Sequence, residues 1–156
     1  MAGADAVYAD PSALLKLYVH QPESAAVNAW RRRLRSALAV TLHGRAEIVN
    51  GICLAAFRGV IGAEAMRDAL ASLEEDFAEG RYVQADLLWR SALQRAAELS
   101  RKHTPAVGCR SLDVLHVASA LELGMARFLT FDGRQRVLAR AAGLRPVVLS
   151  GASAGR

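Results

Sequence analysis

The sequence predicts an α/β domain with a mostly parallel central sheet of four to five strands, flanked by helices on both faces. Short apolar runs alternate along the chain with longer segments whose apolar residues recur at helical spacing. Alternating strands and helices are typical of a parallel sheet covered by helices. The 156 residues, 53% of them hydrophobic, are enough for one buried core. We therefore expect a single domain over residues 1–150 and a flexible C-terminal tail over 151–156.

The first half of the chain is expected to open with a buried strand. Val7–Ala9 is apolar, and Pro11 shortly after it favours the first turn of a helix. Further on, Ile48, Ile52 and Ala55 recur at i, i+4 and i+7, which indicates an amphipathic helix. The expected elements are a strand at 7–9, helices at 11–20 and 22–36, a strand at 38–41 and a helix at 44–58.

The second half continues the alternation. An apolar stripe from Met66 to Phe77 has helical spacing and ends before Gly80, and Pro105 and Gly108 indicate a loop after the following helix. Ser111 can cap the next helix. The expected elements are a helix through 66–77, a brief strand at 81–83, helices at 88–103 and 112–123, a strand at 126–131, a helix at 134–142 and a last strand at 146–149.

Composition bounds the possible partners and the compartment. The formal net charge of +5 favours a polyanionic partner, although charge alone is a weak indication. Cys53 and Cys109 have no zinc-ligand spacing, and we expect both to be small buried thiols. The N-terminus lacks a basic signal-peptide region, and no segment approaches the roughly 18 apolar residues of a membrane span. We expect a cytoplasmic protein.

Two acidic residues follow predicted strands. Asp10 comes directly after the first strand and Asp132 after the strand at 126–131. In open parallel sheets ligands bind beyond the carboxyl ends of the strands, so both acids should face one edge. Each also has a structural explanation, because Asp10 before Pro11 can cap a helix and Asp132 before Gly133 can cap a helix or form a turn.

Two further acids lie on predicted helices. Asp113 stands in the first turn of a nearly apolar helix, where it suits the helix dipole but needs a partner if buried, and Glu47 lies beside the apolar stripe of its helix. Carboxylates gathered in one pocket repel one another unless a divalent cation compensates their charge. Oxygen ligands suit Mg²⁺ or Mn²⁺, which can activate water for phosphodiester cleavage.

His116 lies one turn after Asp113, and the two could in principle supply ligands from one helix face. The preferred interpretation is a hydrogen-bonded core residue or one that orients a ligand, because no other histidine has a matching spacing.

Four segments together resemble the VapC toxins of the PIN-domain family. They are Val7–Tyr18, Arg45–Glu47, Arg110–Leu121 and Phe128–Asp132, in the family's order and on the expected elements. Each motif alone is weak, whereas four in the correct order are fairly specific. The resemblance covers nearly the whole chain and implies a PIN-like fold.

The resemblance also implies a function and a site. It implies a metal-dependent endoribonuclease that cleaves tRNA or ribosomal RNA, forms a homodimer and is silenced by a VapB-type antitoxin. Asp10, Glu47, Asp113 and Asp132 would hold Mg²⁺ or Mn²⁺ and carry the catalysis, and Ser12 and Thr130 would orient a carboxylate or a water. Arg45, Arg110 and Arg134 are candidates for RNA phosphate contacts, alongside the run at 31–35, and the antitoxin could use the same residues.

Two other functions are compatible with the sequence. In a non-catalytic module that binds RNA or protein, the acids would be helix caps; the chain could also be a PIN nuclease of RNA processing outside a toxin pair. Other enzyme classes fit poorly, because the sequence has no G-x-S-x-G, G-x-x-x-x-G-K or G-x-G-x-x-G motif.

Overall fold

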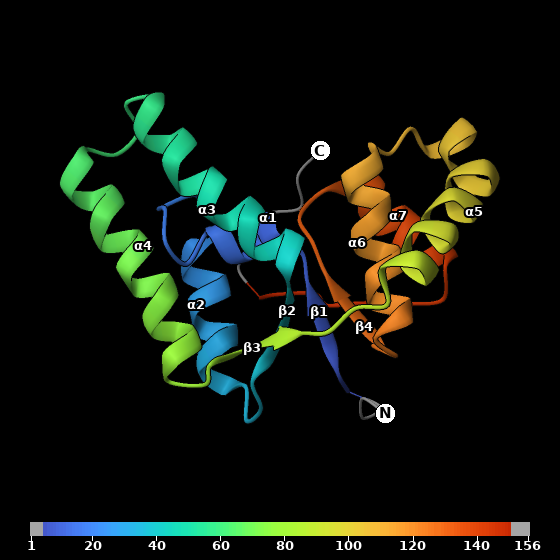
Figure 1. Cartoon of the computed structure of the whole chain (residues 1–156), viewed down its shortest axis with the longest axis horizontal. Helices are drawn as coiled ribbons and strands as arrows, with labels where there is room; N and C mark the ends of the chain where they lie inside the picture. The colour runs from blue at the N-terminus through green and yellow to red at the C-terminus, as the bar shows by residue number, and fades with distance from the viewer. Residues whose placement is uncertain (1–4, 151–156) are drawn as a thin grey trace. The chain divides into compact units, whose positions relative to one another are not determined.

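The computed structural model describes residues 5–150, which form five strands and seven helices (Figure 1). In chain order these are β1 (Val7–Ala9), α1 (Pro11–Leu15), α2 (Ser24–Arg33), β2 (Leu38–Thr41), α3 (Leu42–Phe57), α4 (Ala63–Ala78), β3 (Tyr82–Ala85), α5 (Trp89–Val107), α6 (Ser111–Glu122), β4 (Arg127–Leu129), α7 (Gly133–Ala141) and β5 (Arg145–Pro146). The strand pairs of the described chain are parallel, which confirms the predicted α/β class. The predicted tail at 151–156 lies outside the described residues.

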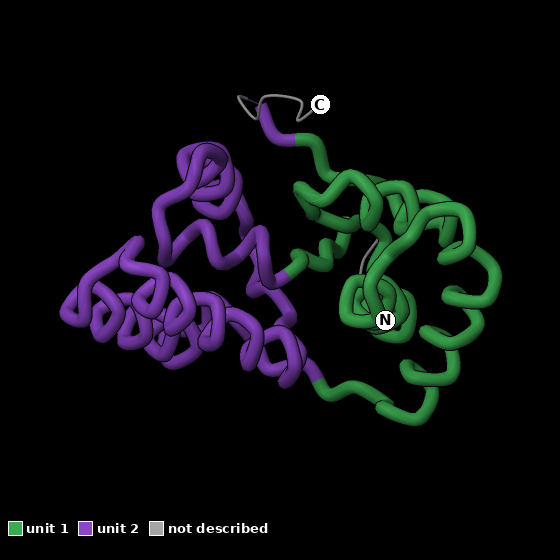
Figure 2. The backbone as a smooth tube through the Cα atoms, turned by 90° about the horizontal axis from the view of Figure 1, so that it is seen from above, with its two compact units in different colours: residues 1–10, 86–148 green, residues 11–85, 149–156 purple. Residues whose placement is uncertain are grey.

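The described chain divides into two compact units (Figure 2). Unit 1 consists of residues 5–10 and 86–148, and unit 2 consists of residues 11–85 and 149–150. The five strands lie accordingly in two sheets: β1, β4 and β5 form the sheet of unit 1, and β2 and β3 form the sheet of unit 2. A single domain over residues 1–150 stays a prediction.

β4 is the central strand of unit 1. Its register with β1 runs from the pair Val7–Arg127 to the pair Ala9–Leu129, and the backbone N–H of Asp10 donates to the carbonyl of Leu129 at 2.9 Å. Parallel neighbours end at the same edge of a sheet, so the residues that follow β1 and β4 are brought close together.

The core of unit 1 forms around the ring of Tyr8. This ring stacks on Phe128 with the centroids 5.5 Å apart and an interplanar angle of 4°. Val117 of α6 and Leu138 of α7 belong to the same buried cluster. The segment 114–120 of α6 is buried throughout, and α6 packs against both α5 and α7. An apolar helix of this kind is stable because it is covered on several sides.

Unit 2 is built on α3. Thr41 caps this helix, because its Oγ1 accepts from the backbone N–H of Gly44 at 3.1 Å. α3 packs against α1 and α4. A Cβ atom at Gly51 would lie 2.7 Å from Cδ2 of Leu15, so the absence of a side chain at Gly51 permits the close approach of α1 and α3.

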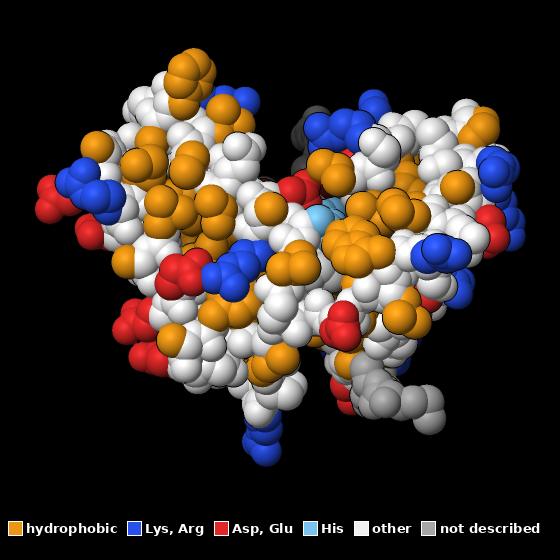
Figure 3. Space-filling view, viewed as in Figure 1, with side chains coloured by type: hydrophobic (Ala, Val, Ile, Leu, Met, Phe, Trp, Pro, Cys, Tyr) orange, Lys and Arg blue, Asp and Glu red, His pale blue; other side chains and the backbone are white. Residues whose placement is uncertain are grey.

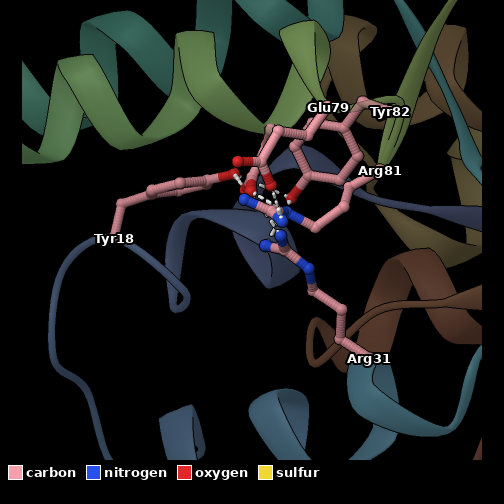
Figure 4. Close-up of polar contacts among 6 residues, drawn as sticks. Tyr18, Arg31, Glu79, Arg81 and Tyr82 are labelled. Atoms are coloured by element: carbon pink, nitrogen blue, oxygen red, sulfur yellow. Dashed lines mark hydrogen bonds and ion pairs between the residues drawn. The ribbon is translucent and has the colours of Figure 1, made fainter.

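A buried acid joins several segments of unit 2. Asp76 of α4 is 4% exposed and accepts from Nη2 of Arg31 and Nε of Arg81, each at 2.5 Å. The hydroxyl of Tyr18 also donates to Asp76, and it contacts the hydroxyl of Tyr82 at 3.0 Å. Figure 4 shows these side chains converging from separate segments. Two guanidinium groups thus compensate the buried carboxylate.

Several helix boundaries differ from the prediction. α2 ends at Arg33 and not near residue 36. α1 ends at Leu15 and not near residue 20, because successive i to i−3 hydrogen bonds tighten the chain over residues 16–18. α5 continues through Pro105, which was expected to lie in a loop, and ends only before Gly108, whose φ of 71° is left-handed. α6 begins at Ser111, but its N-cap is Arg110 and not Ser111.

The remaining differences concern three strands and one cysteine. β3 spans Tyr82–Ala85 where a strand at 81–83 was predicted, and β4 spans only Arg127–Leu129 of the predicted strand at 126–131. β5 comprises only Arg145–Pro146, shorter than the predicted strand at 146–149, although the N–H of Val147 still donates to the carbonyl of Phe128 at 2.9 Å. Cys109 is buried as expected, whereas Cys53 is exposed. No helix within residues 5–150 has the length and apolar character needed to cross a membrane.

Candidate functional site

Three of the four predicted acids lie in unit 1, near the carboxyl ends of β1 and β4. Asp10 directly follows β1, Asp132 is the N-cap of α7 three residues after β4, and Asp113 lies in the first turn of α6. The parallel pairing of β1 with β4 explains why the first two belong to one edge of the sheet.

Asp10 is the most deeply buried of these three acids, with 5% of its surface exposed. Its Oδ1 accepts a hydrogen bond of 2.8 Å from Nε2 of Gln135. A buried carboxylate needs such a donor because burial removes its water. The side chain of Asp10 is therefore held from α7.

Asp113 is hydrogen-bonded to the residue that caps its helix. Its Oδ2 accepts from the backbone N–H and the Nε of Arg110, at 3.3 and 3.1 Å. The hydrogen bond to Asp113 raises the pKa of the Arg110 guanidinium, and the charges of Asp113, Asp132 and Asp10 act in the same direction. The three acids therefore stabilise the positive charge of the Arg110 guanidinium.

Asp132 has a structural role as well as a position at the edge. Its Oδ1 accepts from the backbone N–H of Gln135 at 2.9 Å, which caps α7. Its own backbone N–H donates to Oγ1 of Thr130 at 3.1 Å. The cap that the sequence allowed is thus present, and it also fixes the carboxylate.

Gln135 is a residue of this site that the sequence analysis missed. It is completely buried, and its side chain contacts Asp10, the carbonyl of Asp113 and the hydroxyl of Thr130. The spacing of Asp132 and Gln135 is that of a capping box, which marks the start of a helix. It gives no indication that the glutamine side chain turns inward toward the acids.

A cavity of about 400 Å³ opens beside two of the acids. Asp113 and Asp132 line it together with Arg110, Arg134, Gly108 and Gly133. Nη1 of Arg134 donates to the carbonyl of Gly108 at 3.3 Å, and the side chain of Arg110 is 82% exposed. Carboxylates and guanidinium groups at one cavity can serve a cation and an anionic substrate respectively.

His116 and Thr130 are both buried in unit 1. His116 is 1% exposed, and its Nδ1 lies 2.8 Å from the hydroxyl of Tyr8, two residues before Asp10. Thr130 is 2% exposed and donates from its hydroxyl to Oε1 of Gln135 at 2.6 Å. His116 thus contacts the core residue Tyr8, and Thr130 contacts Gln135, which is hydrogen-bonded to Asp10.

The other predicted residues lie in unit 2. Ser12 is exposed on α1, and Glu47 is half-buried on α3. Arg45 of α3 forms an ion pair with Glu74, and its guanidinium lies 4.3 Å from the ring centroid of Phe77.

The donor set of unit 1 suits a hard cation. Asp113 and Asp132 offer carboxylate oxygens to one cavity, and the charge of Asp10 acts on Arg110, which also lines this cavity. Within residues 5–150, no three or more Asp, Glu, His or Cys side chains are gathered as a ready-made metal cage. Mg²⁺ is usually held by only one or two carboxylates and keeps several waters, so this donor set fits it.

The fold defines an α/β protein with an acidic sheet edge, and comparison with known proteins identifies its family. A model of the PIN domain family matches residues 7–141, and the chain belongs to that family. It is 32% identical over 151 residues to Ribonuclease VapC46 of Mycobacterium tuberculosis (strain ATCC 25618 / H37Rv), covering 93% of this chain and 98% of the relative. The crystal structure of FitAcB from Neisseria gonorrhoeae is similar in fold, with a TM-score of 0.65, 18% identity, and coverage of 91% of this chain and 96% of the other.

Proposed function

We propose that this chain is an Mg²⁺- or Mn²⁺-dependent endoribonuclease that hydrolyses RNA phosphodiester bonds as the toxin of a type II toxin-antitoxin module. The observation that carries the proposal is the set of three acids at the carboxyl edge of unit 1 in a PIN-family chain. The 32% identity to a relative named as a ribonuclease supports RNA as the substrate.

The acids would share the work of holding a cation and water. Asp113 and Asp132 would bind the cation at the cavity, Asp10 would complete the negative site from the buried side, and Glu47 of unit 2 would be the fourth acid. A bound Mg²⁺ or Mn²⁺ supplies Lewis-acid activation of water and stabilises charge on the scissile phosphate. Ser12, Thr130 and His116 would orient these groups without contacting the substrate.

The arginines at the cavity would position the RNA. Arg110 and Arg134 line the cavity and can donate to phosphate oxygens, and Arg45 would contact the backbone elsewhere. Hydrolysis adds water across one P–O bond, so the phosphate gains an oxygen and the leaving ribose oxygen gains a proton. The guanidinium of Arg110 would stabilise the charge that develops on the phosphate oxygens.

Cleavage of a labelled total-RNA pool by the purified, antitoxin-free chain tests the proposal. We expect discrete fragments with Mg²⁺ or Mn²⁺, none with EDTA, and at least about a 100-fold loss of rate in Asp113→Asn, in line with the loss of a group that stabilises the transition state. Asp68→Asn is the matched control, because Asp68 is exposed on α4.

Two outcomes would contradict the proposal. Intact RNA under every divalent-ion condition, combined with RNA binding that weakens with salt, would favour a non-catalytic binding module. Cleavage that persists equally in Asp113→Asn and Asp68→Asn would remove the assigned site. Expression of the chain with and without a gene for a small cognate protein then separates a toxin from a PIN nuclease of RNA processing.

The proposed partners are a VapB-type antitoxin and a second copy of the chain. Three exposed leucines lie at α5 and α6: Leu88 just before α5 (77% exposed), Leu93 on α5 (54%) and Leu112 on α6 (47%). Figure 3 shows apolar side chains exposed over these helices. Exposed apolar surface of this kind commonly marks an interface. Light scattering of the purified chain should give the mass of a dimer. We also propose that the protein acts in the cytoplasm.

A further inference from the structure

Gln135 connects the acids of unit 1 through a chain of hydrogen bonds. The backbone N–H of Asp132 donates to Oγ1 of Thr130 at 3.1 Å, and the Thr130 hydroxyl donates to Oε1 of Gln135 at 2.6 Å. Nε2 of Gln135 then donates to Oδ1 of Asp10 at 2.8 Å and to the carbonyl of Asp113 at 3.2 Å. One amide therefore joins three residues of the acidic edge.

The direction of this chain is fixed by its chemistry. The carboxylate of Asp10 and the carbonyl of Asp113 can only accept, so the amide nitrogen of Gln135 must face them. The amide oxygen must then face Thr130, whose hydroxyl has its proton available because its oxygen accepts from Asp132. Both N–H groups and the oxygen of the amide have partners, so a rotated amide would break three contacts.

This arrangement does more than stabilise the core. Gln135 is completely buried, and an apolar residue would fill the same space without leaving polar atoms to satisfy. Its contacts instead reach a carboxylate after β1, the first turn of α6 and the turn before α7. The residue is placed to set the relative positions of these acids.

We propose that Gln135 is the positioning residue of the acidic site, and that its amide orients the Asp10 carboxylate and ties it to α6 so that the site binds a divalent cation. The inference rests on the proposed function, since that function assigns the cation to these acids. Thr130 acts in the same chain by holding the amide oxygen. Neither residue needs to touch RNA or the cation.

The test measures Mn²⁺ binding to the folded, antitoxin-free chain without RNA, by electron paramagnetic resonance of free Mn²⁺. Gln135→Met keeps the length of the side chain but removes the amide, and we expect its Kd for Mn²⁺ to rise about 10- to 100-fold. Leu138→Val on α7 is the structural control, because Leu138 is completely buried in the core cluster. It should lower the melting temperature and leave the Kd within about twofold.

A second pair of variants tests the chain independently. Thr130→Val removes the hydroxyl and should raise the Kd in the same direction, whereas Thr130→Ser keeps the hydroxyl and should restore binding. The double variant Gln135→Met, Thr130→Val should bind no more weakly than Gln135→Met alone, because residues of one hydrogen-bonded chain are not additive. A purely structural role predicts additive losses of stability with no change of Kd.

The outcomes separate the inference from the proposed function. If the unsubstituted chain binds Mn²⁺ and cleaves RNA while Gln135→Met and Thr130→Val bind Mn²⁺ equally well, the inference is wrong and the function stands. If the unsubstituted chain neither binds Mn²⁺ nor cleaves RNA, both are wrong. Should Gln135→Met not fold, the Thr130→Val and Thr130→Ser pair decides alone: equal Kd values overturn the inference.

Discussion

Asp76 shows how one residue can hold several segments of unit 2 through its charge. Burial alone would raise the pKa of this carboxyl, but hydrogen bonds from Arg31, Tyr18 and Arg81 outweigh burial and hold the pKa below its ordinary value. Burial in the same cluster raises the pKa of Tyr82 to about 12. The negative form of Asp76 is therefore the one on which the packing depends.

Replacing Asp76 with Asn should destabilise the chain by roughly 2 to 3 kcal/mol at pH 7, because two guanidinium groups lose their counter-charge. The pKa of Asp76 is lower in the folded chain than its ordinary value of 3.8, which we take for the unfolded chain. The stability that this difference gives is fully present above pH 3.8 and is lost as the pH falls through the folded pKa. Urea unfolding should therefore show the difference between the chain and Asp76→Asn shrinking below about pH 4. The control is Glu79→Gln, which removes an exposed partner of Arg81 and should change stability by less than about 1 kcal/mol. An equal loss of stability in Asp76→Asn and Glu79→Gln would contradict the structural role given to Asp76.

Individual residues of the candidate site differ in how far the sequence alone predicts them. The positions of Asp10, Asp113 and Asp132 beside strand ends and helix starts could be predicted because such acids leave a local pattern. The contacts of Gln135 could not be predicted, because they reach a residue 125 positions away in the chain. His116 is an intermediate case: a polar residue on an apolar helix predicts some partner, but only the fold shows that the partner is Tyr8.

At the scale of elements, local signals gave the strand at 38–41 with its observed bounds and the helices at 44–58 and 66–77 nearly so. The errors occurred where tertiary packing or capping overrode a local preference. Proline usually predicts a helix end, but α5 continues through Pro105 and ends two residues later at Val107. The residue that caps α5 is Gly108.

Gly108 links α5 to the start of α6, so its conformation should matter to stability. Its φ of 71° and ψ of 34° are left-handed, and its N–H donates to the carbonyl of Thr104 at 2.8 Å. We expect Gly108→Ala to cost about 1 to 2 kcal/mol from backbone strain alone, since an added Cβ would come no closer than 3.8 Å to Arg134. The control is Gly133→Ala at the first residue of α7, where an added Cβ has nothing within 4 Å. Thermal unfolding of both variants measures the effect, and Gly133→Ala should be neutral or slightly stabilising. Equal losses would show that strain at Gly108 is not the cause.

At the scale of the whole molecule, the acidic edge is part of a chain with a net charge of +5. The two charges serve different ligands in the proposed function: the carboxylates attract a cation, and the arginines attract the RNA backbone. The sheet that positions the acids could be predicted from alternating elements, whereas the division of the strands between two compact units could not, because short strands carry no local signal of their neighbours.

This separation of charges makes a prediction for RNA binding that does not depend on cleavage. In an Asp113→Asn background, binding of a short single-stranded RNA should weaken as salt rises, because each phosphate contact releases counterions. Arg134→Ala should reduce the slope of log K against log salt by about 0.7, the value for one phosphate contact on a single strand. Arg67→Ala on the exposed face of α4 is the matched control, and its slope should stay unchanged. Fluorescence anisotropy across a salt series measures both slopes. If the two variants lose the same slope, the basic charge attracts RNA diffusely and the cavity beside Asp113 and Asp132 has no special part in holding it.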